Sequence, residues 1–154
     1  MENSVVIEVR EMLYADVLEA CKLVRDNWGV ETADRARDQM IEYYKGGPYA
    51  PKFFVVDRPD WPEGGLAGFA AYCPSMRMKG DYDLIWIVVA EDCQGLHIGE
   101  ALTRHRLAEI KLRGGSVVSL WTQKPGFFKK FGFEVVREMD SWHLMILQLE
   151  PMRI

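Results

Sequence analysis

The chain has 154 residues, of which 49% are hydrophobic and 27% charged, and its formal net charge is -4 at pH 7. This length and composition are typical of one folded domain with a substantial core, and they exclude an intrinsically disordered protein. The acidic balance argues against nucleic acid as the main partner and is compatible with a cationic or amine-bearing substrate.

The cysteines and the N-terminal sequence bear on the compartment. Cys21, Cys73 and Cys93 are odd in number and share no short spacing, so the sequence predicts neither a disulfide framework nor a zinc site. No basic segment leads into an apolar one at the N-terminus, and the densest apolar run, residues 84–90, is too short to cross a bilayer. We therefore expect a cytoplasmic protein without a metal ion and without a membrane partner.

The N-terminal part of the chain predicts one strand and two helices. Residues 5–12 alternate apolar and polar side chains, which is typical of a half-buried strand. Apolar side chains recur at helical spacing over residues 13–28. Thr32 is expected to cap a second helix, which the Gly-Gly-Pro segment at 46–48 would end.

The middle of the chain predicts three strands in succession. The apolar runs 52–57 and 66–73 are separated by the turn-rich segment 58–65, which favours an antiparallel pair with a long loop. Residues 83–90 are apolar on both faces, as expected of a central strand that is covered on each side.

The C-terminal part predicts a long helix, a strand, a short helix and a closing hairpin. The long helix spans 98–113, the strand 116–122, and the short helix lies within 125–131. Strands at 133–139 and 143–149 form the hairpin. The apolar stripe of the long helix consists of Ile98, Ala101, Leu102, His105, Ala108 and Leu112.

This order of elements predicts an α/β fold in which helices flank one mixed sheet. The order is β, α, α, β, β, β, α, β, α, β, β, which gives about six or seven strands and about four helices, with one crossover connection around the long helix. We find no internal repeat or linker, so residues 1–154 are expected to form a single domain.

The segment CQGLHIGEALT, residues 93–103, carries the first indication of chemistry. It lies where the central strand passes into the long helix, and the first N–H groups of a helix have no intrahelical partner and carry partial positive charge. Gly95 and Gly99 leave room for an anion to approach the backbone, although a tight turn and close packing are the alternatives. The spacing excludes both the dinucleotide-binding motif and the P-loop.

Two stretches together resemble the GNAT N-acetyltransferases. Residues 83–102 are similar to the acyl-CoA-binding core of that family, whose signature [RQ]-x-x-G-x-[GA] lies between a strand and a helix. Gln94 and Gly99 match the signature, whereas His97 stands where the first glycine is usual. Residues 126–136 resemble the second landmark, a short aromatic helix that ends in Gly-Phe before a strand. The resemblance implies a GNAT-like fold and an N-acyltransferase that uses acetyl-CoA, or another acyl-CoA, as co-substrate.

The resemblance also implies which residues bind the acyl-CoA. The backbone of Ile87, Val88 and Val89 would pair with the pantetheine arm, and an N–H group there would polarise the thioester carbonyl. The pyrophosphate would lie against the main chain of the following turn. If the backbone of His97 keeps a negative φ, its Cβ atom is tolerated there, provided that the imidazole points away from the phosphates. The remaining cofactor-binding candidates are Gln94, Gly95, Leu96, Ile98, Gly99, Glu100, Thr122, Phe127 and Phe128.

The implied reaction is direct attack of an amine on the thioester, so an ammonium group must first lose a proton. Asp83 occupies a position where some family members carry a catalytic glutamate, and it is the candidate general base. The alternative is an ordinary carboxylate at a strand end.

Phe128 stands where many relatives have a tyrosine that protonates the leaving thiolate, so the usual general acid is missing. A thiol pKa of about 8.5 still makes the thiolate a good leaving group that water can protonate.

The acceptor pocket of this family lies among the first two helices and the closing hairpin. The short connection at 122–126 is similar to that of domains that acetylate the α-amine of glutamate, which favours a small primary amine such as an amino acid. Two alternative functions stay open, a CoA-binding module without turnover and a peptide or protein acetyltransferase. A homodimer is compatible with the sequence. Candidate lining residues are Trp28, Glu31, Asp34, Tyr43, Trp142 and His143.

Overall fold

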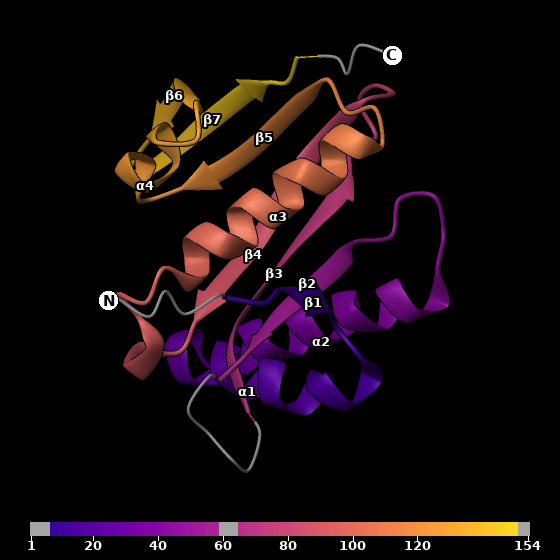
Figure 1. The fold of residues 1–154 in the computed structure, drawn as a ribbon, viewed down its shortest axis with the longest axis vertical. Coiled ribbons are helices and arrows are strands. Elements are labelled where there is room, and N and C mark those ends of the chain that lie inside the picture. The colour runs from indigo at the N-terminus through magenta and orange to yellow at the C-terminus, as the bar shows by residue number, and fades with distance from the viewer. Residues whose placement is uncertain (1–6, 59–64, 151–154) are drawn as a thin grey trace, which may run out of the picture.

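The computed structural model describes residues 7–58 and 65–150, and in them four α-helices flank a mixed sheet of seven strands (Figure 1). The strand order is β1-β2-β3-β4-β5-β7-β6, in which only β4 and β5 pair in parallel. The strands are β1 (Arg10–Glu11), β2 (Lys52–Asp57), β3 (Leu66–Pro74), β4 (Asp81–Val89), β5 (Val117–Thr122), β6 (Glu134–Met139) and β7 (Trp142–Gln148). The helices are α1 (Val17–Trp28), α2 (Val30–Lys45), α3 (Ile98–Leu112) and α4 (Pro125–Lys129).

The sheet is covered on both faces. Side chains from α1 and α2 pack against one face, and side chains from α3 and α4 pack against the other. Strand β2 serves both cores, since Phe53 contributes to the α1/α2 core and Phe54 to the α3 core. The predicted α/β fold, with its single crossover around the long helix, is therefore confirmed.

Strand β4 contains a bulge at Trp86. In the pairing with β3, Ile85 lies opposite Ala71 and Ile87 lies opposite Ala70, so Trp86 has no partner residue. Its φ angle is 52°, a left-handed conformation that is rare for a bulky side chain. The bulge thus changes the course of β4 halfway along the strand.

Strands β4 and β5 separate beyond their first residues. Their paired residues are Asp81–Asp83 with Val117–Ser119, although β4 continues to Val89 and β5 to Thr122. Figure 1 shows the two strands close together at one end of α3 and far apart at the other. The second half of β4 therefore has an edge that β5 does not cover.

Two predictions about the N-terminal elements need correction. Within the described residues, the strand expected over 5–12 is only Arg10–Glu11, and residues 1–6 lie outside the described part. Thr32 does not cap α2, because the helix begins two residues earlier and the Thr32 hydroxyl instead lies 3.4 Å from the carbonyl oxygen of Trp28. Gly29, with a φ of 93°, both ends α1 and precedes α2.

The predicted apolar stripe of α3 is wrong at two positions. Leu112 is 73% exposed and Ala108 is also exposed, whereas Arg106 and Ile110 are buried. The buried face follows steps of four residues from Ile98, so a selection by hydrophobicity passes over the polar side chain at 106.

Candidate active site

A cavity of about 1030 Å³ opens where β4 and β5 separate, and we call it the β4/β5 cleft. It is lined by residues of β4, β5, α4 and the turn before α3. Residues from the C-terminal end of α1 and from α2 also line it. Leu96 is not among the lining residues and is 50% exposed. The other predicted cofactor-binding residues all line the cleft: Ile87, Val88, Val89, Gln94, Gly95, His97, Ile98, Gly99, Glu100, Thr122, Phe127 and Phe128.

The N-terminal end of α3 faces this cleft without a capping side chain. His97 is the residue at the N-cap, and its side chain makes no capping hydrogen bond. The first intrahelical bond runs from the N–H group of Ala101 to the carbonyl oxygen of His97. The N–H groups of the first turn are therefore arranged as in helix termini that bind anions.

His97 adopts a left-handed backbone conformation, with φ 65° and ψ 21°. The condition of a negative φ at this position is therefore not met. The left-handed conformation gives a physical reason for the glycine that is usual here. The imidazole is 79% exposed, and its Nδ1 atom lies 3.4 Å from Oε2 of Glu100.

Glu100 is the carboxylate nearest to this turn. It accepts a hydrogen bond of 2.9 Å from Arg104, and Lys130 lies 4.0 Å from it. The Arg104 hydrogen bond, followed by the contact with His97, lowers the pKa of the Glu100 carboxyl. The mouth of the cleft thus carries both cationic and anionic groups.

Gly99 and the two aromatic residues of α4 form one wall of the cleft. A Cβ atom at Gly99 would meet the Phe127 ring at 3.4 Å and the Ile87 side chain at 3.6 Å, which are ordinary contacts. The rings of Phe127 and Phe128 meet edge to face with centroids 4.9 Å apart. Phe128 is 5% exposed and belongs to the core beneath the cleft.

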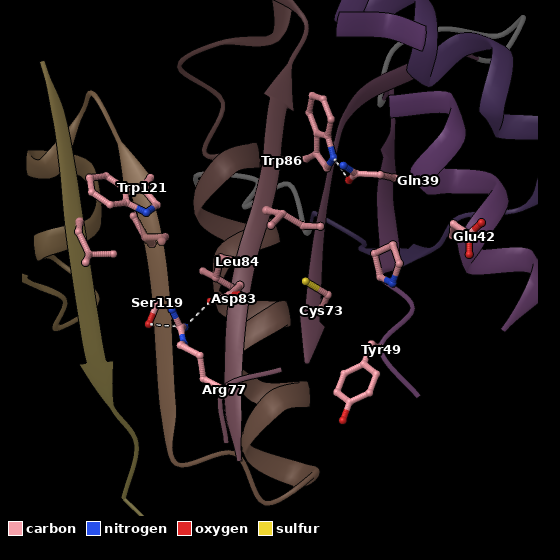
Figure 2. Close-up of a pocket in the computed structure, with 14 residues that line it drawn as sticks. Gln39, Glu42, Tyr49, Cys73, Arg77, Asp83, Leu84, Trp86, Ser119 and Trp121 are labelled. Carbon is pink, nitrogen blue, oxygen red and sulfur yellow. Dashed lines mark hydrogen bonds and ion pairs between the residues drawn. The ribbon is translucent and has the colours of Figure 1, made fainter. Parts of the chain in front are cut away.

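Asp83 lies in a second, neighbouring cavity of about 580 Å³, the Asp83 cavity (Figure 2). Its Oδ1 atom accepts a hydrogen bond of 2.9 Å from Nη2 of Arg77, which also lies 3.5 Å from the Ser119 hydroxyl. The two cavities share lining residues, namely Gln39, Leu84, Ile85, Trp86, Leu120 and Trp121. Asp83 therefore lines only the Asp83 cavity, which adjoins the β4/β5 cleft at these shared residues.

Cys73 also lines the Asp83 cavity. Burial, together with the negative charge of Asp83, raises the pKa of the Cys73 thiol to about 11. The thiol is therefore protonated at neutral pH and is a poor nucleophile.

The sequence does not reveal which residues line both cavities. The indole Nε1 of Trp86 donates a hydrogen bond of 2.6 Å to Oε1 of Gln39, so a strand of the sheet is tied to α2 between the two cavities (Figure 2). An apolar run contains no signal for a bulge, because the bulge depends on how the neighbouring strand pairs.

The predicted acceptor-pocket residues are only partly brought together. Trp28 and Trp142 line the β4/β5 cleft, whereas Glu31, Asp34, Tyr43 and His143 line neither cavity. Asp34 instead lies 3.8 Å from Arg37, and the Tyr43 hydroxyl lies 3.2 Å from Glu11. Residues that line the cleft on this side, and that the sequence did not suggest, are Asn27, Thr32, Arg35 and Gln39.

Two further observations concern membranes and metals. Within residues 7–58 and 65–150, no helix is both long and apolar enough to cross a membrane. The same residues contain no group of three or more histidine, cysteine, aspartate or glutamate side chains arranged to hold a metal ion.

The fold is that of a known family. Residues 50–135 match the model of the GNAT acetyltransferase domain, which is more than half of the chain. The chain therefore belongs to the GNAT acetyltransferase family. Among curated protein sequences, none matches this chain.

Solved structures of this family share the fold at low sequence identity. A GNAT-family protein from Desulfovibrio desulfuricans is 23% identical, with a TM-score of 0.79, over 93% of this chain and 99% of that one. A GNAT acetyltransferase from Brucella melitensis in complex with acetyl-CoA is 20% identical, with a TM-score of 0.71, over 95% of this chain and 90% of that one. The ribosomal-protein-S18-alanine N-acetyltransferase from Escherichia coli is 16% identical, with a TM-score of 0.72, over 96% of each chain.

Proposed function

We propose that this enzyme transfers the acetyl group of acetyl-CoA to a primary amine of a small molecule by direct attack. The observation that carries the proposal is the β4/β5 cleft, in which an uncapped helix terminus and an uncovered strand edge lie side by side. The complex of the Brucella melitensis structure with acetyl-CoA supports the choice of co-substrate.

Three parts of acetyl-CoA have a proposed counterpart in the cleft. We place the pyrophosphate at the first turn of α3, against backbone N–H groups of Gly95 and of residues 97–100. The peptide-like pantetheine arm follows β4 at residues 87–89, where its amides form the hydrogen bonds that β5 does not supply. The thioester then lies next to β4, where a strand N–H group can stabilise the oxyanion that forms on attack.

The amine enters from the α2 face through the Asp83 cavity. Arg77 uses Oδ1 of Asp83, which leaves Oδ2 for a water molecule or for the substrate ammonium. Asp83 then accepts the proton through water, because it lines the adjoining cavity and not the cleft itself. The thiolate of CoA leaves and takes a proton from water, since Phe128 provides no hydroxyl group.

The size of the Asp83 cavity favours a small acceptor over a peptide. Its volume of about 580 Å³ lies within the range typical of small-molecule sites. Tyr49, Trp86 and Trp121 supply aromatic surface around two carboxylates, Glu42 and Asp83, as suits an amine with an apolar portion. The Escherichia coli neighbour, which acts on a ribosomal protein, makes a peptide acceptor the second candidate.

The test is a binding assay followed by a panel of acceptors. Acetyl-CoA should raise the melting temperature, because a ligand that binds only the native state stabilises it. Release of free CoA is then measured with small primary amines and amino acids, and with peptides that carry free N-termini.

Each outcome decides between the candidate functions. Turnover with a small amine supports the proposal, and turnover with peptides alone replaces it by peptide acetylation. Binding without turnover across the whole panel indicates a CoA-binding module. If acetyl-CoA, CoA and longer acyl-CoAs all fail to bind, the acyltransferase function is contradicted.

A further inference from the structure

Arg106 is a charged side chain in the middle of α3 that is 1% exposed. It lies on the face of the helix that packs against the sheet, between Leu102 and Ile110, both of which are fully buried. Among the described residues, none of the salt bridges involves Arg106. Its partners are instead the oxygen atoms of neutral groups.

The guanidinium group donates to backbone carbonyl groups of both β3 and β4 at the β4 bulge. Nη1 lies 2.9 Å from the carbonyl oxygen of Ala71, 3.2 Å from that of Trp86 and 3.4 Å from that of Ile85. In the pairing of β3 with β4, Ala71 lies opposite Ile85 and Trp86 has no partner, so these carbonyl groups lie where the register shifts. Arg106 thus donates to both strands at the bulge.

The same side chain is connected to the first turn of α3. Nη2 donates to the Thr103 hydroxyl at 3.3 Å, and that hydroxyl donates to the carbonyl oxygen of Gly99 at 2.8 Å. The β4 bulge and the helix turn at the cleft are therefore joined by one chain of hydrogen bonds.

A buried cation without a carboxylate partner is costly, and packing alone does not account for it. Burial lowers the pKa of Arg106 to about 9, which still leaves the group charged at neutral pH. An apolar side chain of similar length would fill the same space without this cost of desolvation. The guanidinium group adds several N–H donors that are held in a fixed planar geometry.

We propose that Arg106 is a positioning residue that fixes the β4 bulge at Trp86 and, through it, the acyl-CoA-binding edge of residues 87–89. The inference rests on the proposed function for its effect on turnover, but not for its effect on the strand. Arg106 holds the carbonyl group of Trp86 from the α3 side. Gln39 holds the indole from the α2 side (Figure 2). Trp86, which lines both the cleft and the Asp83 cavity, is thus held from both faces of the sheet.

The test compares Arg106→Lys and Arg106→Met with Lys111→Met, an exposed position on the same helix. Amide hydrogen exchange is measured in the free protein, and kcat and the KM for acetyl-CoA are measured with the best acceptor. We expect exchange at residues 86–89 to accelerate about tenfold or more in both Arg106 variants and to stay unchanged in Lys111→Met. We also expect kcat to fall by about tenfold or more, with a smaller change in KM, because small displacements at a reacting centre are costly.

The exchange pattern separates this inference from the proposed function. Exchange and kcat that both match the wild type would overturn the positioning role, as would exchange that accelerates equally in all strands. If no acceptor is turned over, local acceleration at residues 86–89 still supports the role of Arg106 while the proposed function fails.

A milder variant covers the case in which neither Arg106 variant folds. Thr103→Val is nearly isosteric and removes only the hydroxyl that Arg106 and Gly99 share. It should accelerate exchange at residues 86–89 by about threefold, and unaltered exchange there would overturn the proposal.

Discussion

His97, at the start of α3, has a strained backbone conformation. A left-handed backbone is unfavourable for a side chain with a Cβ atom, and glycine adopts it without that cost. We expect His97→Gly to raise the free energy of unfolding by about 0.5 to 1 kcal/mol, after the greater freedom of glycine in the unfolded chain is subtracted. Urea denaturation measures this change.

The control for this prediction is His97→Ala, which removes the ring but keeps the Cβ atom. It should give no comparable gain in stability. A loss of stability in His97→Gly would show that the contact of the imidazole with Glu100 outweighs the backbone strain.

Asp83 carries the chemical prediction at the residue scale. If this carboxylate accepts the proton of the ammonium, Asp83→Asn should lower kcat by about 100-fold or more and leave the KM for acetyl-CoA nearly unchanged. Steady-state kinetics at saturating acetyl-CoA measure this effect. Asp81→Asn is the matched control, since Asp81 lies on the same strand and also near Arg77, at 3.8 Å. Equal kcat values in the two variants would remove Asp83 from the mechanism.

At the scale of elements, β3 and β4 approach each other closely at Gly68. A Cβ atom there would lie 2.7 Å from the carbonyl oxygen of Val88 and 3.3 Å from the side chain of Ile98. We expect Gly68→Ala to lower the free energy of unfolding by about 1 to 3 kcal/mol, because the backbone of β4 must move. Gly126→Ala is the control, since nothing lies within 4 Å of the added atom. Equal melting temperatures of the two variants would contradict the prediction.

The start of α3 gives a second prediction at this scale. Alanine at position 99 would make only ordinary contacts with Phe127 and Ile87, whereas the two additional methyl groups of valine would crowd the cleft wall beside the first turn of α3, where we place the pyrophosphate. Gly99→Val should therefore weaken acetyl-CoA binding by about tenfold or more, which corresponds to about 1.4 kcal/mol. Calorimetric titration measures the dissociation constant. Similar constants for Gly99→Val and Gly99→Ala would place the pyrophosphate elsewhere.

Glu109 ties α3 to the sheet and gives a pH dependence. It accepts hydrogen bonds from Lys52 of β2 and, at 2.9 Å, from the Tyr72 hydroxyl of β3. Burial opposes ionisation of this carboxyl, but the hydrogen bonds from Lys52 and Tyr72 outweigh it and lower the pKa. Because the folded pKa lies below the unfolded value, the stabilisation is present above the unfolded pKa of about 4.3 and is lost as the pH falls through the folded pKa.

The measurement is the melting temperature from pH 7 down to pH 3. The melting temperature of the wild type should fall on acidification, and Glu109→Gln should start lower and fall less over the same range. Parallel curves for the two proteins would contradict the assignment.

At the scale of the whole molecule, the sequence predicts the order of the elements because hydrophobic periodicity and glycine stops are local properties. It also predicts Gln94 and Gly99 at the mouth of the cleft, where the structure places them. It does not predict the burial of Arg106 or the bulge at Trp86, since both depend on contacts between segments far apart in the chain. The acceptor side is the least predictable part for the same reason, and of the proposed residues only Trp28 and Trp142 reach the cleft.

The short pairing between β4 and β5 divides the sheet into two parts that are joined at one end. Only three residues of each strand form the ladder between them, so β5, β6 and β7 belong to one part and β1 to β4 belong to the other. In the proposed complex, the pantetheine arm would lie between the two parts and form hydrogen bonds with the uncovered edge of β4. The co-substrate would then also be a structural component, which joins the two parts of the sheet while the acetyl group is held for transfer.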